Sequence, residues 1–502
     1  MLVGLWVLAV ATAAARPPKR FNPVVEAQNF SITQQRQRIY DTPQYQADLA
    51  RVSVDQWLLG METAKADPER NFTDDLCWNH GNGCAGDIRL YDWANNGYGL
   101  VRPVLFTARD GATISGHVWA TVAGPRKRPG IVITDGSVQA DEQLYWYAAQ
   151  TLAKAGYVVL TFDPQGQGMS DTYGEAPDRN EGVPAQTDGR PFYDGTEDAI
   201  NFFLSTPRHP YEPVRSCTTG TSHAPKQKRR VRERLDTAFN PFWQLLNRGE
   251  LGLAGHSYGA AGVSYVGQWD PRVKAIVAWD DLGGPGPKDA PVPGQAGGSR
   301  TIGEAGCPAD PAARRMVPVR KPALGMSADY GLPPTPNTSL PPPEGKSIWS
   351  LKYSSAGVDT GEIIIRGGSH LDFSWIPNQA FGASLRGPDI IDWYTTAWFD
   401  KYLKHERSAD RRLLTERWRH DPVEAGVDPN HDGDAFSFYY YSRLDFHLFG
   451  GRRFDCEDLR AGCRGMVAHD GYRGDYSYIS IDTEPDAVVG PGRSLAVGNR
   501  LF

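Results

Sequence analysis

The chain has 502 residues, of which 53 are Lys or Arg and 59 are Asp or Glu, so its formal charge is −6. Hydrophobic residues make up 40% of the chain and charged residues 22%, which is the composition of a globular protein with a sizeable core. These totals exclude a fibrous, disordered or membrane-embedded protein. The near-neutral charge also gives no basic footprint for nucleic acid, so we expect no nucleic-acid partner.

The first fifteen residues form a short apolar run, MLVGLWVLAVATAAA, followed by the basic stretch 16–20. A helix of that length spans ~22 Å, which is less than the hydrocarbon core of a bilayer at ~30 Å. Ala13 and Ala15 fit a cleavage site with small residues, so we expect residues 1–15 to be a secretory signal peptide. The mature chain is then expected to be secreted and to have no integral membrane segment; an uncleaved anchor is the alternative.

The six cysteines agree with export, because disulfides persist in oxidising compartments. Two pairs each flank a loop of six residues, which is longer than the spacing of a zinc site. Short loops are the ones that cost least entropy to close. We therefore expect the disulfides Cys77–Cys84, Cys456–Cys463 and, from the remaining two, Cys217–Cys307. Free buried thiols are the alternative.

Residues 16–101 are polar and weakly periodic, and we expect an N-terminal extension with one or two helices packed on the rest of the chain. From Arg102 onward, short apolar runs alternate with helical periodicity. The expected strands are 104–108, 113–122, 130–136, 157–163, 251–257, 273–281, 322–329 and 362–370. The expected helices are 144–155, 196–206, 260–269 and 389–404. This alternation predicts a doubly wound, mostly parallel α/β sheet over residues 102–404.

Long stretches between these elements are not needed by the sheet: 164–193, 207–248, 283–319 and 330–346. In an open α/β sheet the ligand lies beyond the carboxyl ends of the strands, so we expect these insertions to form a lid or pocket wall.

The strongest charge run, KQKRRVRER at 226–234, is expected to be solvated surface, with a contact to an anionic surface as the alternative. Residues 405–502 are expected to be a C-terminal extension, either a small β module or an addition to the sheet edge.

One motif carries the chemistry: Gly255-His256-Ser257-Tyr258-Gly259, a G-x-S-x-G between an expected strand and a helix of small residues. A serine on a sharp strand-to-helix turn presents its hydroxyl above the sheet edge. The two glycines let the strand and the helix approach closely. An ordinary turn serine is the alternative.

With this motif the chain resembles the α/β-hydrolase superfamily, in particular its secreted serine esterase and lipase branch, over about 102–404. The resemblance implies a nucleophile, an acid and a histidine in that chain order, and no cofactor. It selects Ser257 as the nucleophile and His370, at the end of the last parallel strand, as the base. For the acid it favours Asp329, with Asp280 or Asp281 one strand earlier as the alternative.

The resemblance also implies an oxyanion hole formed by two backbone N–H groups. The expected donors are Tyr258, which follows the nucleophile, and Ser137, in the loop after the strand 130–136. The superfamily often has His-Gly at this loop, where this chain has Asp135-Gly136. The turn 163–168 (DPQGQG) resembles a recurrent turn of the superfamily and is interpreted as structural.

A calcium-loop pattern is also present: Asp428, Asn430 and Asp432 match the start of an EF-hand loop. Position twelve is Tyr439, which has no carboxylate, and we expect no flanking helices. A plain acidic turn is therefore the expectation, and a structural calcium the alternative.

Together these features predict a secreted serine hydrolase that cleaves carboxylic esters, small or polymeric, through an acyl-enzyme on Ser257. Two alternatives remain. One is a peptidase or amidase of the same superfamily, and the other a non-catalytic binding protein on a hydrolase scaffold.

Overall fold

The computed structural model describes residues 20–35, 60–72, 97–137, 141–179, 190–216, 218–285, 317–374, 386–414 and 436–466, and single residues at 47, 50, 54, 58, 93 and 182. The expected signal peptide, the pairs Cys77–Cys84 and Cys217–Cys307, and the 428–434 loop lie outside the described residues.

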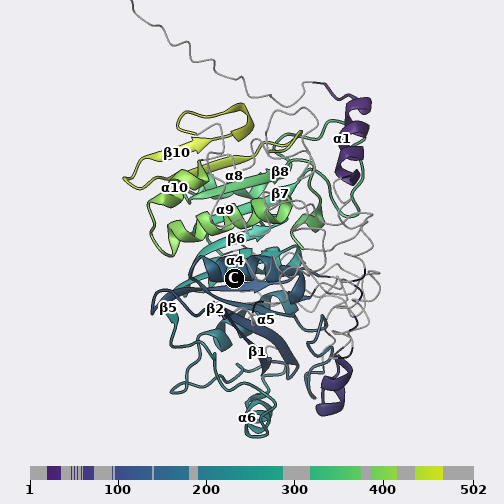
Figure 1. Ribbon diagram of the computed structural model, residues 1–502, viewed down its shortest axis with the longest axis vertical. Coiled ribbons are helices and arrows are strands. Elements are labelled where there is room, and N and C mark those ends of the chain that lie inside the picture. The colour runs from purple at the N-terminus through teal and green to yellow at the C-terminus, as the bar shows by residue number, and fades with distance from the viewer. Residues whose placement is uncertain are drawn as a thin grey trace, which may run out of the picture.

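Within the described residues, ten strands form one mixed sheet in the order β1-β2-β4-β3-β5-β6-β7-β8-β9-β10, which runs along the long axis in Figure 1. The six strands from β4 to β8 pair in parallel, and the strands at both margins are antiparallel. The strands are β1 (Gly99–Thr107), β2 (Thr113–Thr121), β3 (Arg128–Thr134), β4 (Val158–Phe162), β5 (Leu246–His256), β6 (Val273–Trp279), β7 (Ala323–Ala328), β8 (Thr360–Ile365), β9 (Arg443–His447) and β10 (Arg453–Cys456). The predicted mostly parallel α/β sheet is thus confirmed.

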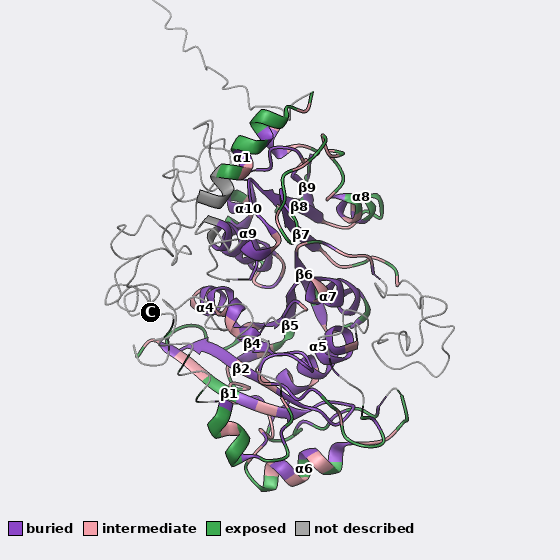
Figure 2. Ribbon diagram, turned by 90° about the vertical axis from the view of Figure 1, so that its right-hand side faces the viewer, coloured by how far each residue is buried: buried purple, intermediate pink, exposed green. Residues whose placement is uncertain are grey.

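Helices cover both faces of this sheet (Figure 2). The described helices are α1 (Pro23–Gln35), α4 (Trp146–Lys154), α5 (Arg190–Phe203), α6 (Ala224–Arg232), α7 (Tyr258–Trp269), α8 (Ile348–Ser355), α9 (Arg386–Tyr402) and α10 (Ser408–Leu413). One core cluster joins α4 and α9 to one face of the sheet, and a second joins α5, α7 and α8 to the other. The central strands are therefore buried on both faces, which is why they read as continuous apolar runs.

Two glycines at positive φ mark boundaries that the sequence predicts. Gly111, at φ 89°, closes the hairpin between β1 and β2, and Gly156, at φ 96°, follows the end of α4. Only glycine adopts this region without steric cost, so both elements end where their sequences indicate.

The stretch 207–248, expected as an insertion, contains a helix that periodicity did not predict, α6. A second unpredicted helix, α8, follows the stretch 330–346, and α5 begins earlier than expected, at Arg190. The C-terminal extension adds β9 and β10 to the edge of the sheet beside β8. The predicted Cys456–Cys463 disulfide is confirmed and closes the loop after β10, with a Cα–Cα separation of 5.9 Å.

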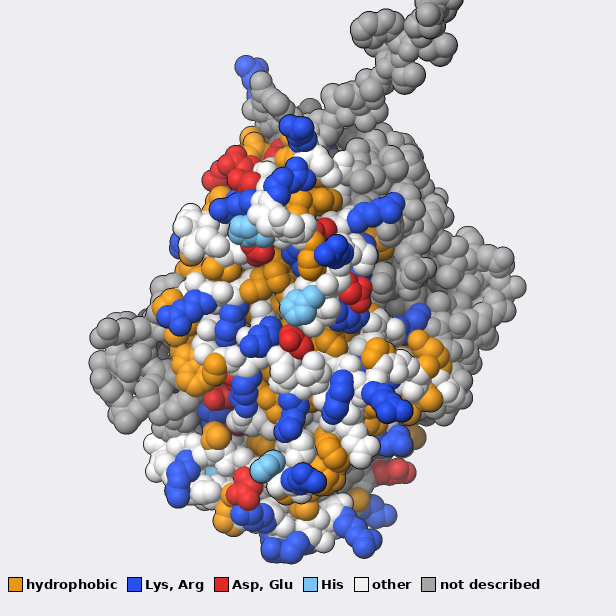
Figure 3. All heavy atoms as spheres, turned by 90° about the vertical axis from the view of Figure 1, so that its left-hand side faces the viewer, with side chains coloured by type: hydrophobic (Ala, Val, Ile, Leu, Met, Phe, Trp, Pro, Cys, Tyr) orange, Lys and Arg blue, Asp and Glu red, His pale blue; other side chains and the backbone are white. Residues whose placement is uncertain are grey.

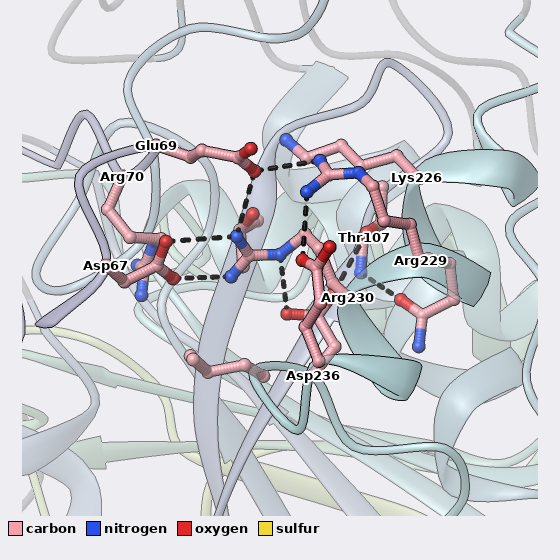
Figure 4. A network of polar contacts seen from close by, with 12 residues as sticks. Asp67, Glu69, Arg70, Thr107, Lys226, Arg229, Arg230 and Asp236 are labelled. Carbon is pink, nitrogen blue, oxygen red and sulfur yellow. Dashed lines mark hydrogen bonds and ion pairs between the residues drawn. The ribbon is translucent and has the colours of Figure 1, made fainter.

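The basic run 226–234 is only in part the solvated surface that its composition indicates. Lys228 and Arg232 are exposed, but the side chain of Arg230 is fully buried. Its guanidinium donates to Asp236 at 2.8 Å and to Asp67, from the N-terminal extension, at 2.6 Å (Figure 4). A buried cation needs such partners, so the described part of the extension is fastened to α6 through charge.

Charge is unevenly spread over the surface. Exposed basic residues recur where parallel strands begin, at Arg126, Lys127, Lys274 and Arg320. Figure 3 shows the side of the molecule that lies at the left in Figure 1, and Lys and Arg side chains are more frequent there than Asp and Glu. Among the helices of the described residues, none combines the length and the apolar character that a membrane span requires.

Candidate active site

Ser257 occupies a sharp turn between a strand and a helix. β5 ends at His256 and α7 begins at Tyr258, and Ser257 between them has φ 57° and ψ −114°. A non-glycine residue at positive φ is uncommon and costs about 1–3 kcal/mol, so the surrounding structure must hold it there. The hydrogen bond from Ser257 N to Trp279 O, at 2.9 Å, anchors the turn to β6.

The two glycines of the motif make this turn sterically possible. A Cβ on Gly255 would lie 2.5 Å from the carbonyl oxygen of Gly259, and a Cβ on Gly259 would overlap the carbonyl oxygens of Thr134 and Asp135. The first turn of α7 therefore packs directly against the end of β5 and the loop after β3. This contact is the physical reason for the spacing of the G-x-S-x-G motif.

His370 begins a short 3-10 helix, His370–Asp372, in the loop after β8. Ser369 and Asp372 form a reciprocal capping box, in which Ser369 N donates to the Asp372 carboxylate at 2.6 Å. The imidazole of His370 is 17% exposed. The cap fixes the backbone of a histidine whose ring still reaches solvent.

The carboxylate that contacts His370 is that of Asp280, directly after β6. Asp280 Oδ2 makes a short hydrogen bond with His370 Nδ1, and the Asp280 side chain is 13% exposed. Burial alone would raise the pKa of Asp280, but the charge and hydrogen bond of His370, with help from Lys346, lower it to about 2. Asp280 is therefore ionised throughout the neutral range.

Asp329, the acid that the resemblance favoured, lies after β7 and makes other contacts. Its oxygens accept hydrogen bonds from Gly367 N at 2.7 Å, from Phe438 N at 3.2 Å and from the Ser437 hydroxyl. Burial raises its pKa in spite of these bonds. Asp329 thus ties the loop that leads to His370 to the C-terminal extension. Asp281 is exposed, so of the three candidates the structure brings Asp280 to His370.

His256 places the turn of Ser257 beside His370. The two imidazole rings lie 4.5 Å apart between centroids, and His256 Nε2 is 3.1 Å from the carbonyl oxygen of His370. Burial, followed by the nearby His370, lowers the pKa of His256 well below its usual value, so this imidazole is neutral. Since Ser257 directly follows His256, Ser257, His370 and Asp280 gather at the same edge of the sheet.

The loop after β3 approaches the same turn. A Cβ on Gly136 would lie 3.3 Å from Ser257 Cβ, so this loop abuts the serine, and Ser137, one of the two expected oxyanion donors, is partly exposed there. The other donor, Tyr258 N, opens α7. The side chain of Asp135 is fully buried, and burial together with Asp163 raises its pKa well above the usual range.

Sequence reasoning missed several residues of this site. Lys346 donates a short hydrogen bond to the carbonyl oxygen of Ala328 and lies close enough to lower the pKa of Asp280. It comes from the Pro-rich stretch 330–346, where no pattern marks it. Tyr145 contacts His256 Nδ1 at 2.8 Å across 111 positions of chain. For this contact, the signal in the sequence is the imidazole of His256, which lies inside the G-x-S-x-G motif.

The described residues contain no group of three or more His, Cys, Asp or Glu side chains arranged to hold a metal ion. Asp428, Asn430 and Asp432, the candidate calcium ligands, fall outside this part of the chain, so that alternative stays as the sequence leaves it.

No protein-family model matches the chain, and a search of curated proteins finds no significant match. Function must therefore be argued from the site itself.

Proposed function

We propose that this chain is a serine hydrolase of carboxylic esters, built on the α/β-hydrolase fold. The observation that carries the proposal is the contact between Asp280 and His370 Nδ1 at the sheet edge where Ser257 is held at positive φ. The chain order is Ser257, then Asp280, then His370, which is the order of nucleophile, acid and base in that superfamily.

In this proposal Ser257 Oγ attacks the acyl carbon of the ester while His370 Nε2 takes its proton. Asp280 engages Nδ1, so Nε2 is the nitrogen left for this task. The carboxylate also stabilises the imidazolium that forms. The imidazolium then gives the proton to the departing alkoxide, the alcohol leaves, and the acyl group stays on Ser257.

Water completes the reaction in the same way. His370 Nε2 removes a proton from the water as its oxygen attacks the acyl carbon, and the proton then passes to Ser257 Oγ as the carboxylic acid departs. In both steps the negative charge on the former carbonyl oxygen is met by the N–H groups of Tyr258 and Ser137. One such donor is typically worth ~10²–10³ in rate.

The substrate class is a carboxylic ester, small or part of a polymer, and the place of action is outside the cell. The Cys456–Cys463 disulfide supports the second point, because such bonds persist in oxidising compartments.

A fluorophosphonate probe tests the proposal, since it reacts covalently with an activated serine. The folded protein should be labelled at Ser257, located by peptide mass spectrometry, and should hydrolyse one or more p-nitrophenyl esters of graded chain length. Ser257→Ala should abolish labelling and lower kcat by about 10⁶. Ser355→Ala, which removes an exposed hydroxyl on α8, is the matched control. Absence of labelling in the folded wild-type protein would remove the enzyme hypothesis.

A further inference from the structure

Both backbone groups of Gly136 are held by buried side chains. Gln167 Nε2 donates to the carbonyl oxygen of Gly136 at 2.6 Å, and Gly136 N donates to the hydroxyl of Tyr145 at 3.0 Å. Gln167 and Tyr145 are both fully buried. Glycine has the freest backbone of all residues, so these two contacts restrict a position that would otherwise turn easily.

The contact from Gln167 also orients the next N–H group. The carbonyl of Gly136 and the N–H of Ser137 belong to one peptide unit, and in a planar trans peptide they point in opposite directions. By holding the carbonyl on one side, Gln167 makes the N–H of Ser137 face the other. Gly136 abuts Ser257, so the N–H that Gln167 orients is the one expected to meet the reacting oxygen.

Gln167 is poorly explained by stability alone. Its amide nitrogen has a partner, but within the described residues its Oε1 is buried without a hydrogen-bond partner. A buried polar atom without a partner costs about 1–3 kcal/mol. An apolar side chain of the same length would avoid that cost but would take this donor from the buried carbonyl oxygen of Gly136, so the contact with Gly136 is the feature that the glutamine uniquely supplies.

Tyr145 also takes part in a series of hydrogen bonds that extends from Gly136 to His370, the proposed base. Because the carbonyl oxygen of His370 can only accept, His256 Nε2 carries the proton and donates to it. His256 Nδ1 is then the acceptor for the hydroxyl hydrogen of Tyr145, whose oxygen in turn accepts from Gly136 N. One directed chain of hydrogen bonds therefore links Gly136 to the backbone of His370.

We propose that Gln167 and Tyr145 are positioning residues that hold the Gly136–Ser137 peptide as an oxyanion donor in register with His370. This inference rests on the proposed function. It also gives one residue of the turn 163–168, Gln167, a role in the reaction, beyond the structural one that the sequence indicates.

The test uses Gln167→Met, which keeps the length of the side chain and removes its donor. We expect kcat on a p-nitrophenyl ester to fall about tenfold or more, up to the ~10²–10³ value of one oxyanion donor, with KM changed less than about twofold. The inhibition constant of a trifluoromethyl ketone, which forms a tetrahedral adduct with the serine, should rise by the same factor as kcat falls, because both report charge on the oxyanion.

Gln165→Met is the matched control. Gln165 lies in the same turn and is buried, and its Nε2 donates to a backbone carbonyl outside the site, that of Thr172, at 3.2 Å. This variant should show a comparable change in thermal unfolding with kcat and the inhibition constant within about twofold of wild type. If Gln167→Met does not fold, Tyr145→Phe is tested instead. It removes the hydroxyl that accepts the hydrogen bond from Gly136 N, and it should lower both kcat and the affinity for the ketone.

The outcomes distinguish a failure of this inference from a failure of the proposed function. A wild-type protein that hydrolyses esters through Ser257, with Gln167→Met equal to wild type or no worse than Gln165→Met, overturns this inference and leaves the proposed function standing. A folded wild-type protein that neither reacts with the fluorophosphonate nor hydrolyses esters overturns both.

Discussion

Asp280 and His370 are joined by a short hydrogen bond although 90 positions separate them in the chain. Asp280 follows β6. The next strand of the sheet, β7, is followed by another aspartate, Asp329, which accepts hydrogen bonds from backbone N–H groups and a serine hydroxyl instead. The two carboxylates therefore differ in what they hold. Asp280 orients an imidazole, and Asp329 orients the loop that carries it.

Because the two carboxylates make different contacts, we expect their substitutions by asparagine to have different effects. Asp280→Asn should lower kcat by about 10⁴ with little change in folding, because the amide favours the wrong tautomer of His370 and cannot stabilise the imidazolium. Asp329→Asn should keep most of kcat and lower the thermal unfolding temperature, because it disturbs the contacts to Gly367 and Ser437. Steady-state kinetics and thermal unfolding of both variants check this. A larger loss of kcat in Asp329→Asn would reassign the acid.

The position of the serine and of the histidine was predictable because each follows a buried run at a turn. Which of the three aspartates contacts His370 was not. Asp280, Asp281 and Asp329 all follow neighbouring parallel strands, and the sequence does not show which way each carboxylate turns. That is decided by the backbone just past the strand, where Asp280 has φ 48°. The expected sheet and its helices followed from periodicity, whereas the burial of Arg230 depends on Asp67, 163 positions away.

Gly136 should be intolerant of a side chain. A Cβ there would lie 3.0 Å from His256 Nδ1 and 3.3 Å from Ser257 Cβ, so both residues would have to move by tenths of an ångström. Gly136→Ala should therefore lower kcat by about tenfold or more, since misplacement on this scale is costly in an active site. Gly331→Ala, where a Cβ would meet nothing within 4 Å, is the control. Equal kcat values in these two variants would contradict the close approach.

Stability should depend on pH through the cluster of charged side chains around Arg109. The guanidinium of Arg109, only 4% exposed, faces three carboxylates, those of Asp194, Glu197 and Asp198. Burial, only partly offset by Arg109 and Arg190, raises the pKa of Asp194 to about 7.

The direction in which the free energy of unfolding changes with pH follows from the proton bound by Asp194. Between about pH 4 and 7 the unfolded chain has released the proton of Asp194 and the folded chain retains it, so the free energy of unfolding falls as the pH rises through this window. Asp194→Asn should remove that fall, which amounts to at most about 4 kcal/mol. Urea unfolding at pH 5 and pH 8 measures it. Asp455→Asn, at an exposed position of β10, should leave the wild-type slope unchanged, and an identical slope in Asp194→Asn would refute the assignment.

The buried ion pairs of Arg230 predict the largest loss of stability. Arg230→Met leaves Asp67 and Asp236 without their cation, and removing one partner of a buried ion pair typically costs about 3–5 kcal/mol. The exposed Arg232→Met, from the same basic run, should change the free energy of unfolding by less than about 0.5 kcal/mol. Urea unfolding compares the two variants.

A triple variant separates the loss of charge compensation from the loss of packing. Adding Asp67→Asn and Asp236→Asn to Arg230→Met removes the two uncompensated carboxylates, so it should recover a large part of the lost stability. Limited proteolysis gives a second readout: residues 60–72 should be cut faster in Arg230→Met than in Arg232→Met, because Arg230 pairs with both Asp67 and Glu69 and so helps to fasten this segment to α6. Equal cutting in the two variants, or no recovery in the triple variant, would mean that charge does not hold the extension in place.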